Sequence, residues 1–155
     1  CLVSLVLIFS CIELVHCQSV DCTFINSTGS YWDLTPLRYD PTNPSPLGYS
    51  YTSYDGNTFY VNFCDEVSNS NLSDCNKSAP SGSCQRSTRN YYSAGTVASM
   101  TFVDFTPFAS YFEGIAIEYS DGTYCSNVGS YRTTVINVAC DATVDDFQIV
   151  SESEP

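Results

Sequence analysis

The stretch "GIAIEYSDGTYCSNVGSYRTTVINVACD", residues Gly114 to Asp141, carries the clearest fold signal in the chain. Apolar and polar residues alternate before Asp121-Gly122, a dipeptide that favours tight turns between strands. We expect a hairpin from Gly114 to Cys125 and a further strand from Tyr131 to Cys140. That strand would contain Arg132, one of only five Lys and Arg residues in the 155-residue chain.

The rest of the chain shows the same pattern of short strands and turns. "YSYTSYDGNTFYVNF" (residues 49–63) predicts a second hairpin, which turns at Asp55-Gly56. Residues 22–34 and 96–105 predict further strands, whereas the polar "CQRSTRNYYSAG" (84–95) predicts only the edge of a strand. No stretch has a helical period of 3.6 residues. The sequence therefore predicts an all-β fold, an antiparallel barrel or sandwich.

The composition excludes several classes of function. The net charge is −12, which argues against binding to nucleic acids or anionic membranes. The single histidine, His16, lies near the N-terminus, so the rest of the chain lacks the usual base of a nucleophilic triad. The cysteines are too widely spaced for a typical zinc site. We expect neither an enzyme, nor a metal site, nor a cofactor.

The N-terminal segment predicts secretion. Leu2 to Phe9 is an apolar run with the length of a signal-peptide core, and we expect residues 1–19 to be a signal peptide whose start is incomplete. Removal of this signal peptide would leave residues 20–155 as one mature domain. The alternative is that the apolar run is a buried strand of the mature fold.

Cysteines and glycosylation motifs also support secretion. Three N-x-[ST] motifs predict glycosylation at Asn26, Asn71 and Asn76. Six cysteines outside the signal segment are expected to form disulfides: Cys22, Cys64, Cys75, Cys84, Cys125 and Cys140. These features predict residence in the lumen of the secretory pathway or outside the cell.

Three motifs in this order resemble the mannose 6-phosphate receptor homology (MRH) domain family: the aromatic hairpin ending at Cys64, the Cys84-Gln85 pair, and the block from Tyr119 to Asp141 that contains Arg132. The resemblance covers roughly residues 21–155. It implies a flattened, disulfide-stabilised barrel of two antiparallel sheets that binds mannose, sometimes 6-phosphorylated, through a Gln, an Arg, a Glu and a Tyr.

The resemblance assigns roles residue by residue. Gln85, Arg132 and Glu154 match the carbohydrate-binding positions, with Glu152 as the second match for the carboxylate. The binding Tyr, the last two cysteines and the closing strand are expected beyond Pro155. The residues alone also allow other interpretations. Arg132 could pack its stem along the sheet with its head in water, Gln85 could be an exposed polar residue of a strand, and Glu154 could be one more acid in a solvated tail.

The resemblance also implies a disulfide pairing. Cys22 would pair with Cys64, and Cys75 with Cys84. Cys125 and Cys140 would bond to the two cysteines beyond Pro155. A direct Cys125–Cys140 bridge is the alternative, and it would place the resemblance in doubt.

Three hypotheses for the function follow. The first is a lectin module for mannose-bearing N-glycans or glycoproteins, part of a sorting receptor or quality-control factor of the endoplasmic reticulum, Golgi or lysosomal system. The second is a scaffold that keeps the MRH fold without binding sugar, in a type I membrane protein whose anchor lies outside this sequence. The third is a secreted hydrolase with two carboxylates. The loop Ser126–Ser130 offers donors to a phosphate but contains no basic residue, so the sequence does not decide between phosphorylated and plain mannose.

Overall fold

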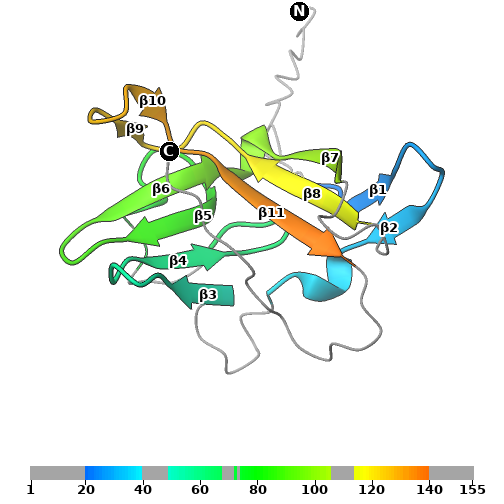
Figure 1. Cartoon of the computed structure of the whole chain (residues 1–155), viewed down its shortest axis with the longest axis horizontal. Helices are drawn as coiled ribbons and strands as arrows, with labels where there is room; N and C mark the ends of the chain where they lie inside the picture. The colour runs from blue at the N-terminus through cyan, green and yellow to red at the C-terminus, as the bar shows by residue number, and fades with distance from the viewer. Residues whose placement is uncertain (1–19, 40–48, 68–71, 73, 106–113, 140–155) are drawn as a thin grey trace, which may run out of the picture.

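The computed structural model describes residues 20–39, 49–67, 72, 74–105 and 114–139, and in these ranges the protein is built from antiparallel strands (Figure 1). The regular elements between the strands are short 3₁₀ turns, such as η1 (Thr35–Leu37) and η3 (Val97–Ser99). The all-β antiparallel class predicted from the sequence is therefore confirmed.

Two larger sheets and two small ribbons make up the described fold. The first sheet has the order β3-β4-β5-β6, with β3 (Tyr49–Thr52), β4 (Thr58–Val61), β5 (Ser81–Arg86) and β6 (Tyr91–Thr96). The second has the order β11-β8-β7, with β7 (Thr101–Phe105), β8 (Gly114–Tyr119) and β11 (Thr134–Ala139). The ribbons are β1 (Thr23–Ile25) with β2 (Tyr31–Asp33), and β9 (Tyr124–Cys125) with β10 (Ser130–Tyr131). The two ribbons lie at opposite ends of the view in Figure 1.

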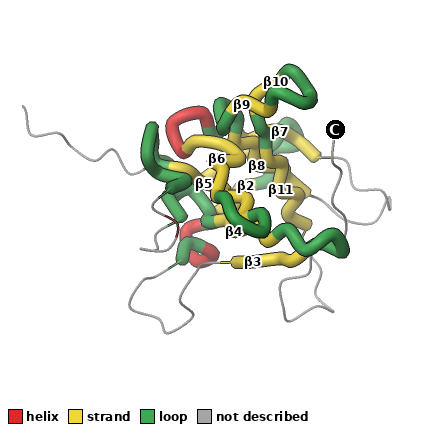
Figure 2. Tube along the Cα trace, turned by 90° about the vertical axis from the view of Figure 1, so that its left-hand side faces the viewer, coloured by secondary structure: helices red, strands yellow, loops and turns green. Residues whose placement is uncertain are grey.

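The main core lies between the two larger sheets (Figure 2). Ile115, Ile117 and Ile136 of the second sheet share one buried cluster with Phe63, and Val61 of the first sheet packs against it. A second cluster around Tyr60 and Leu72 covers the other face of the first sheet. Because strand residues alternate between faces, the first sheet buries aromatic residues on both sides.

Tyr119 at the end of β8 connects the two sheets. Its side chain is fully buried, its hydroxyl donates to the carbonyl of Asn62 at 2.8 Å, and the amide of Cys64 donates to the same hydroxyl at 2.8 Å. The ring lies so close to Gly82 of β5 that a Cβ there would overlap its Cδ1 atom at 2.6 Å. Glycine at position 82 is therefore what allows the sheets to approach.

Two disulfides fasten loops to this core. Cys22 bonds to Cys64 and Cys75 to Cys84, the pairing that the MRH resemblance implies. Cys125 forms no disulfide with any residue in the described ranges, and Cys140 lies outside them. A bridge between Cys125 and Cys140 therefore stays untested.

Some strand predictions were wrong in detail. Residues 84–95 are not a mere edge but most of a full hairpin, β5 and β6. The Asp121-Gly122 turn does not join two paired strands, since β8 pairs with β7 and β11. The region expected to be one strand from Tyr131 is divided between β10 and β11.

The hydrogen-bonded strands do not close into a barrel within the described ranges, which form four separate sheets. The sandwich-like pair of sheets is therefore the accurate description of that part of the chain. Among the described residues, no helix is long and apolar enough to cross a membrane.

Candidate functional site

Arg132 lies in the short connection between β10 and β11 rather than inside a strand. The connection is held by backbone hydrogen bonds to the segment after β8: the amide of Gly122 donates to the carbonyl of Arg132 at 3.0 Å, and the amide of Arg132 to the carbonyl of Thr123 at 3.3 Å. The strand break corrects the sequence prediction. Because Arg132 is outside a strand, the direction of its side chain is not set by the alternation of strand residues between two faces.

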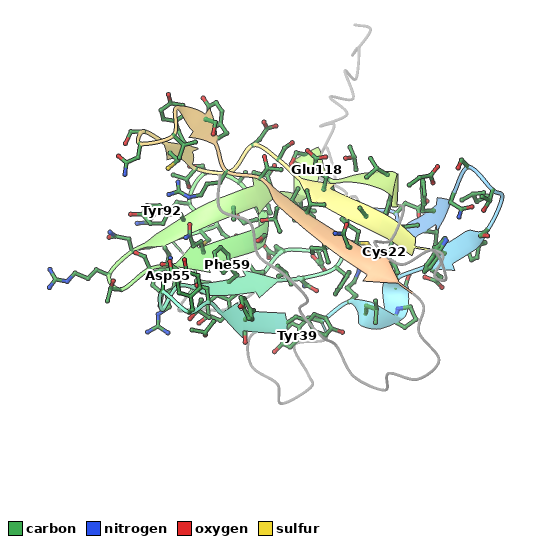
Figure 3. The ribbon with its side chains drawn as sticks, in the orientation of Figure 1. Cys22, Tyr39, Asp55, Phe59, Tyr92 and Glu118 are labelled. Carbon is green, nitrogen blue, oxygen red and sulfur yellow. A yellow bond between two sulfur atoms is a disulfide. The ribbon has the colours of Figure 1, made fainter. Side chains whose placement is uncertain are left out.

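Gln85 lies on β5, and its cross-strand partners place it in a row of aromatic residues. Phe59 of β4 is opposite Gln85 on one side and Tyr92 of β6 is opposite it on the other. Residues directly opposite in an antiparallel pair share a face. All three side chains are partly exposed. Figure 3 shows Phe59 and Tyr92 in the half of the molecule that holds the first sheet, with Cys22 in the other half.

The side chains of Gln85 and Arg132 meet directly. Nε of Arg132 donates to Oε1 of Gln85 at 3.2 Å, and the guanidinium carbon lies 4.3 Å from the centre of the Tyr92 ring. Nη1 donates to the carbonyl of Thr123 at 3.0 Å. The guanidinium is thus held by an amide, a ring face and a backbone carbonyl. The structure brings together the two binding residues expected from the MRH resemblance.

Hydrogen-bond donors remain unused at this pair. Nε2 of Gln85 and Nη2 of Arg132 have no partner among the described residues, and each carries two N–H groups. Both side chains are half-buried. The described part of the site therefore offers donors to a ligand rich in oxygen acceptors. A group that accepts hydrogen bonds from the ligand's own hydroxyls must come from another part of the chain.

Hydrogen bonds near Gln85 and Arg132 join the two larger sheets. The hydroxyl of Thr134 on β11 donates to the carbonyl of Ala94 at 2.9 Å and hydrogen-bonds the hydroxyl of Ser83 at 2.9 Å. Ser83 is two residues before Gln85 on β5, and Thr134 is two residues after Arg132. The sheets are thus tied together close to where the two binding candidates meet.

The two candidate carboxylates, Glu152 and Glu154, lie outside the described residues. Tyr92 is the residue at this site that sequence reasoning missed. The available sequence signal was the polar run Ser87–Asn90, which indicates a turn, and the structure closes that turn with a hydrogen bond from the amide of Ser87 to the carbonyl of Asn90 at 2.9 Å. A turn over 87–90 sets Tyr92 opposite Gln85.

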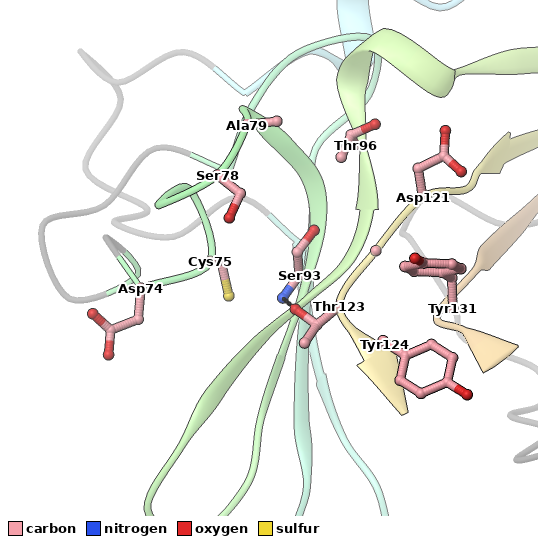
Figure 4. Close-up of a pocket in the computed structure, with 11 residues that line it drawn as sticks. Asp74, Cys75, Ser78, Ala79, Ser93, Thr96, Asp121, Thr123, Tyr124 and Tyr131 are labelled. Carbon is pink, nitrogen blue, oxygen red and sulfur yellow. Dashed lines mark hydrogen bonds between the residues drawn. The ribbon is translucent and has the colours of Figure 1, made fainter. Parts of the chain in front are cut away.

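A cavity of about 390 Å³ lies on the other side of β6 (Figure 4). Ser93 and Thr123 form its middle, where the amide of Ser93 donates to the Thr123 hydroxyl at 3.1 Å. Ser93 follows Tyr92 in the strand and so faces the opposite side. Neither Gln85 nor Arg132 lines the cavity. The contact between these two side chains, rather than this hollow, identifies the candidate site.

Two predicted glycosylation sites lie in the described ranges. Asn26 is in the turn between β1 and β2, where its Oδ1 accepts the Thr28 hydroxyl at 2.7 Å. Asn76 uses its side chain structurally: its Nδ2 donates to the carbonyl of Val67 at 3.1 Å, and its Oδ1 accepts the amide of Ser81 at 2.9 Å. Asn71 lies outside the described ranges, and glycosylation at all three stays a prediction.

Comparison with protein families agrees with this geometry. The model of the cation-independent mannose-6-phosphate receptor repeat matches residues 8–126. The chain belongs to this family. The match confirms the MRH-type resemblance and the lectin-type fold that it implied. The matched range contains Gln85 and the two disulfides found among the described residues, whereas Arg132 lies beyond its end.

The family assignment also limits the other interpretations. Comparison with curated proteins gives no match for the chain. A receptor repeat with two disulfides is consistent with a lumenal or extracellular location. The assignment offers no support for the hydrolase hypothesis. That the chain is not an enzyme stays a prediction.

Proposed function

We propose that this receptor repeat is a lectin module that binds mannose-bearing N-glycans in the lumen of the secretory pathway, as part of a sorting receptor or quality-control factor. The observation that carries the proposal is the direct contact between Gln85 and Arg132. It supports a shared binding site because Gln85 of β5 meets Arg132 of the β10–β11 connection, and four N–H donors of the pair have no partner among the described residues.

The chemistry of the pair suits a sugar. Neighbouring hydroxyls of a hexose present oxygen acceptors at fixed separations, and planar amide and guanidinium groups fix the directions of their donors. The partly exposed ring of Phe59 beside Gln85 supplies apolar surface for the C–H face of a sugar. We assign acceptance of the sugar's hydroxyl hydrogens to Glu154, with Glu152 as the alternative.

Binding to a glycan array and calorimetry with methyl α-mannoside test the proposal. The full-length protein from a secretory host should bind the mannoside and discriminate against methyl α-glucoside, its C2 epimer. Arg132→Ala should weaken binding at least about tenfold, since hydrogen bonds from a charged group are lost. Arg89→Ala, which removes the same charge from an exposed turn residue, is the matched control.

Equal mannoside binding by the Arg132→Ala and Arg89→Ala proteins would contradict the proposed site. Absence of glycan binding in the wild type would favour the scaffold hypothesis instead. Parallel measurements with mannose 6-phosphate would decide whether phosphate contributes, because plain and phosphorylated sugars share the hydroxyls that Gln85 and Arg132 would bind.

A further inference from the structure

Tyr92 is unusual among the aromatic residues of its sheet because its ring packs on a cation. The guanidinium carbon of Arg132 lies 4.3 Å from the ring centre, well within the range of a cation–π contact. Tyr92 belongs to neither hydrophobic cluster of the described residues, whereas its neighbour Tyr91 packs against the cluster around Tyr60. The two tyrosines, adjacent in sequence, therefore have different physical roles.

We propose that Tyr92 is the positioning residue of the site, whose ring face fixes the Arg132 guanidinium so that the unused edges of Arg132 and Gln85 are presented together to the sugar. This inference rests on the proposed function of that pair. Tyr92 acts through Arg132, so its own contact with the ligand is not required.

The contacts around Arg132 explain why a third support is needed. An arginine side chain has four rotatable bonds, and ordering it is entropically unfavourable. The bond to Gln85 fixes Nε, and the bond to Thr123 fixes Nη1. The ring covers one face of the group. Together these contacts restrict the guanidinium before any ligand arrives.

Covering one face also determines how a ligand can bind. A sugar cannot stack on the side of the guanidinium that Tyr92 occupies. Hydrogen bonds to a sugar must come from the edge that carries Nη2, because the N–H groups lie in the plane of the guanidinium and Nη2 has no partner among the described residues. Edge-on approach favours two neighbouring oxygen atoms in one plane, as vicinal hydroxyls provide, over an aromatic or apolar ligand.

The test compares variants that keep or remove the ring. Tyr92→Phe keeps the ring and should bind methyl α-mannoside within about twofold of the wild type. Tyr92→Leu and Tyr92→Thr remove it and should weaken binding about fivefold or more. Thr is included because it suits a strand if the Leu variant fails to fold. Tyr91→Leu is the matched control, expected to lower thermal stability while the folded fraction keeps its affinity.

A second readout separates positioning from stability. The Nε–H signal of Arg132 in nuclear magnetic resonance spectra of the free protein should be shifted by the ring current of Tyr92. The shift should persist in Tyr92→Phe and vanish in the ring-free variants. Vanishing of the shift with unchanged mannoside affinity would overturn the inference while leaving the lectin proposal intact. A wild type that binds no mannoside would overturn both.

Discussion

Nε of Arg132 donates a hydrogen bond to Oε1 of Gln85 at 3.2 Å, although the two residues are 47 positions apart in the sequence. The bond consumes the acceptor of the amide and leaves its donors available. A substitution that keeps an acceptor at position 85 but removes the donors can therefore separate the structure of the site from its binding chemistry.

Gln85→Glu is that substitution. A carboxylate still accepts from Arg132, with added charge attraction, so the free energy of unfolding should not decrease. The N–H donors of the amide are lost, and we expect mannoside binding to weaken at least about tenfold. Calorimetry and thermal melting of the same sample check this. Retained affinity would remove Gln85 as a donor to the sugar.

The hydroxyl of Tyr119 predicts a decline of stability at alkaline pH. Burial raises the pKa of Tyr119 to about 12, above the ordinary value of 10. The native state therefore holds the proton more tightly than the unfolded state. The contribution is complete below pH 10 and is lost as pH rises from 10 through 12, by about 2–3 kcal/mol.

Urea unfolding at pH 9, 10, 11 and 12 measures that decline. In Tyr119→Phe the decline should be smaller, because the titrating group is gone. The same variant should be less stable at neutral pH by about 1–3 kcal/mol, since the Cys64 amide and the Asn62 carbonyl lose a buried partner. An identical pH profile in both proteins would show that Tyr119 does not ionise in this range.

Gly82→Ala should destabilise the protein through a steric conflict. The new Cβ would overlap the ring of Tyr119, with Cδ1 at 2.6 Å and Cζ at 2.8 Å. That ring is buried and cannot move aside freely, so we expect a loss of about 1–3 kcal/mol, typical of overpacking. Gly29→Ala is the control, because outside its chain neighbours no heavy atom lies within 4 Å of the added Cβ and only its positive φ of 88° opposes the change. Equal losses in chemical denaturation would exclude the steric explanation.

The two disulfides should contribute unequally. Cys22–Cys64 closes a sequence separation of 42 and Cys75–Cys84 one of 9. Loop-closure entropy predicts about 4 kcal/mol for the long loop and about 3 kcal/mol for the short one. Paired Cys→Ala variants, compared in urea at neutral pH, measure both. A larger loss from the short loop would mean that native contacts, rather than entropy of the unfolded chain, decide the outcome.

Turn dipeptides and alternating apolar residues predicted those turns and strands that depend on neighbouring residues. The Asp55-Gly56 turn was predicted correctly because its conformation needs a glycine: Gly56 adopts a φ of +84°, which glycine favours. Asp121 also has a positive φ, of 57°, yet its turn leads into a connection because β8 pairs with β7 and β11 and not with the strand that follows the turn. The hairpin β5–β6 was underestimated because Ser and Gly are poor strand formers, although Ser81 and Ser83 are buried in it.

The candidate site was predictable only through the family resemblance. Nothing in the spacing of Gln85 and Arg132 indicates a contact, since the contact depends on how the β10–β11 connection lies against the first sheet. Tyr92 was missed for a related reason: its importance comes from cross-strand register, which a single sequence specifies weakly where the turn is polar.

The placement of Tyr119 and Thr134 between the sheets has a consequence for ligand capture. Tyr119 lies directly opposite Thr134 in the ladder. The Thr134 hydroxyl bonds Ser83 of the first sheet, and the Tyr119 hydroxyl bonds Asn62, the residue that follows β4. These hydrogen bonds join the two sides of the site, which cannot separate unless buried contacts between the sheets are broken. Recognition should accordingly follow a lock-and-key course, in which arrival of the glycan leaves the backbone almost unmoved.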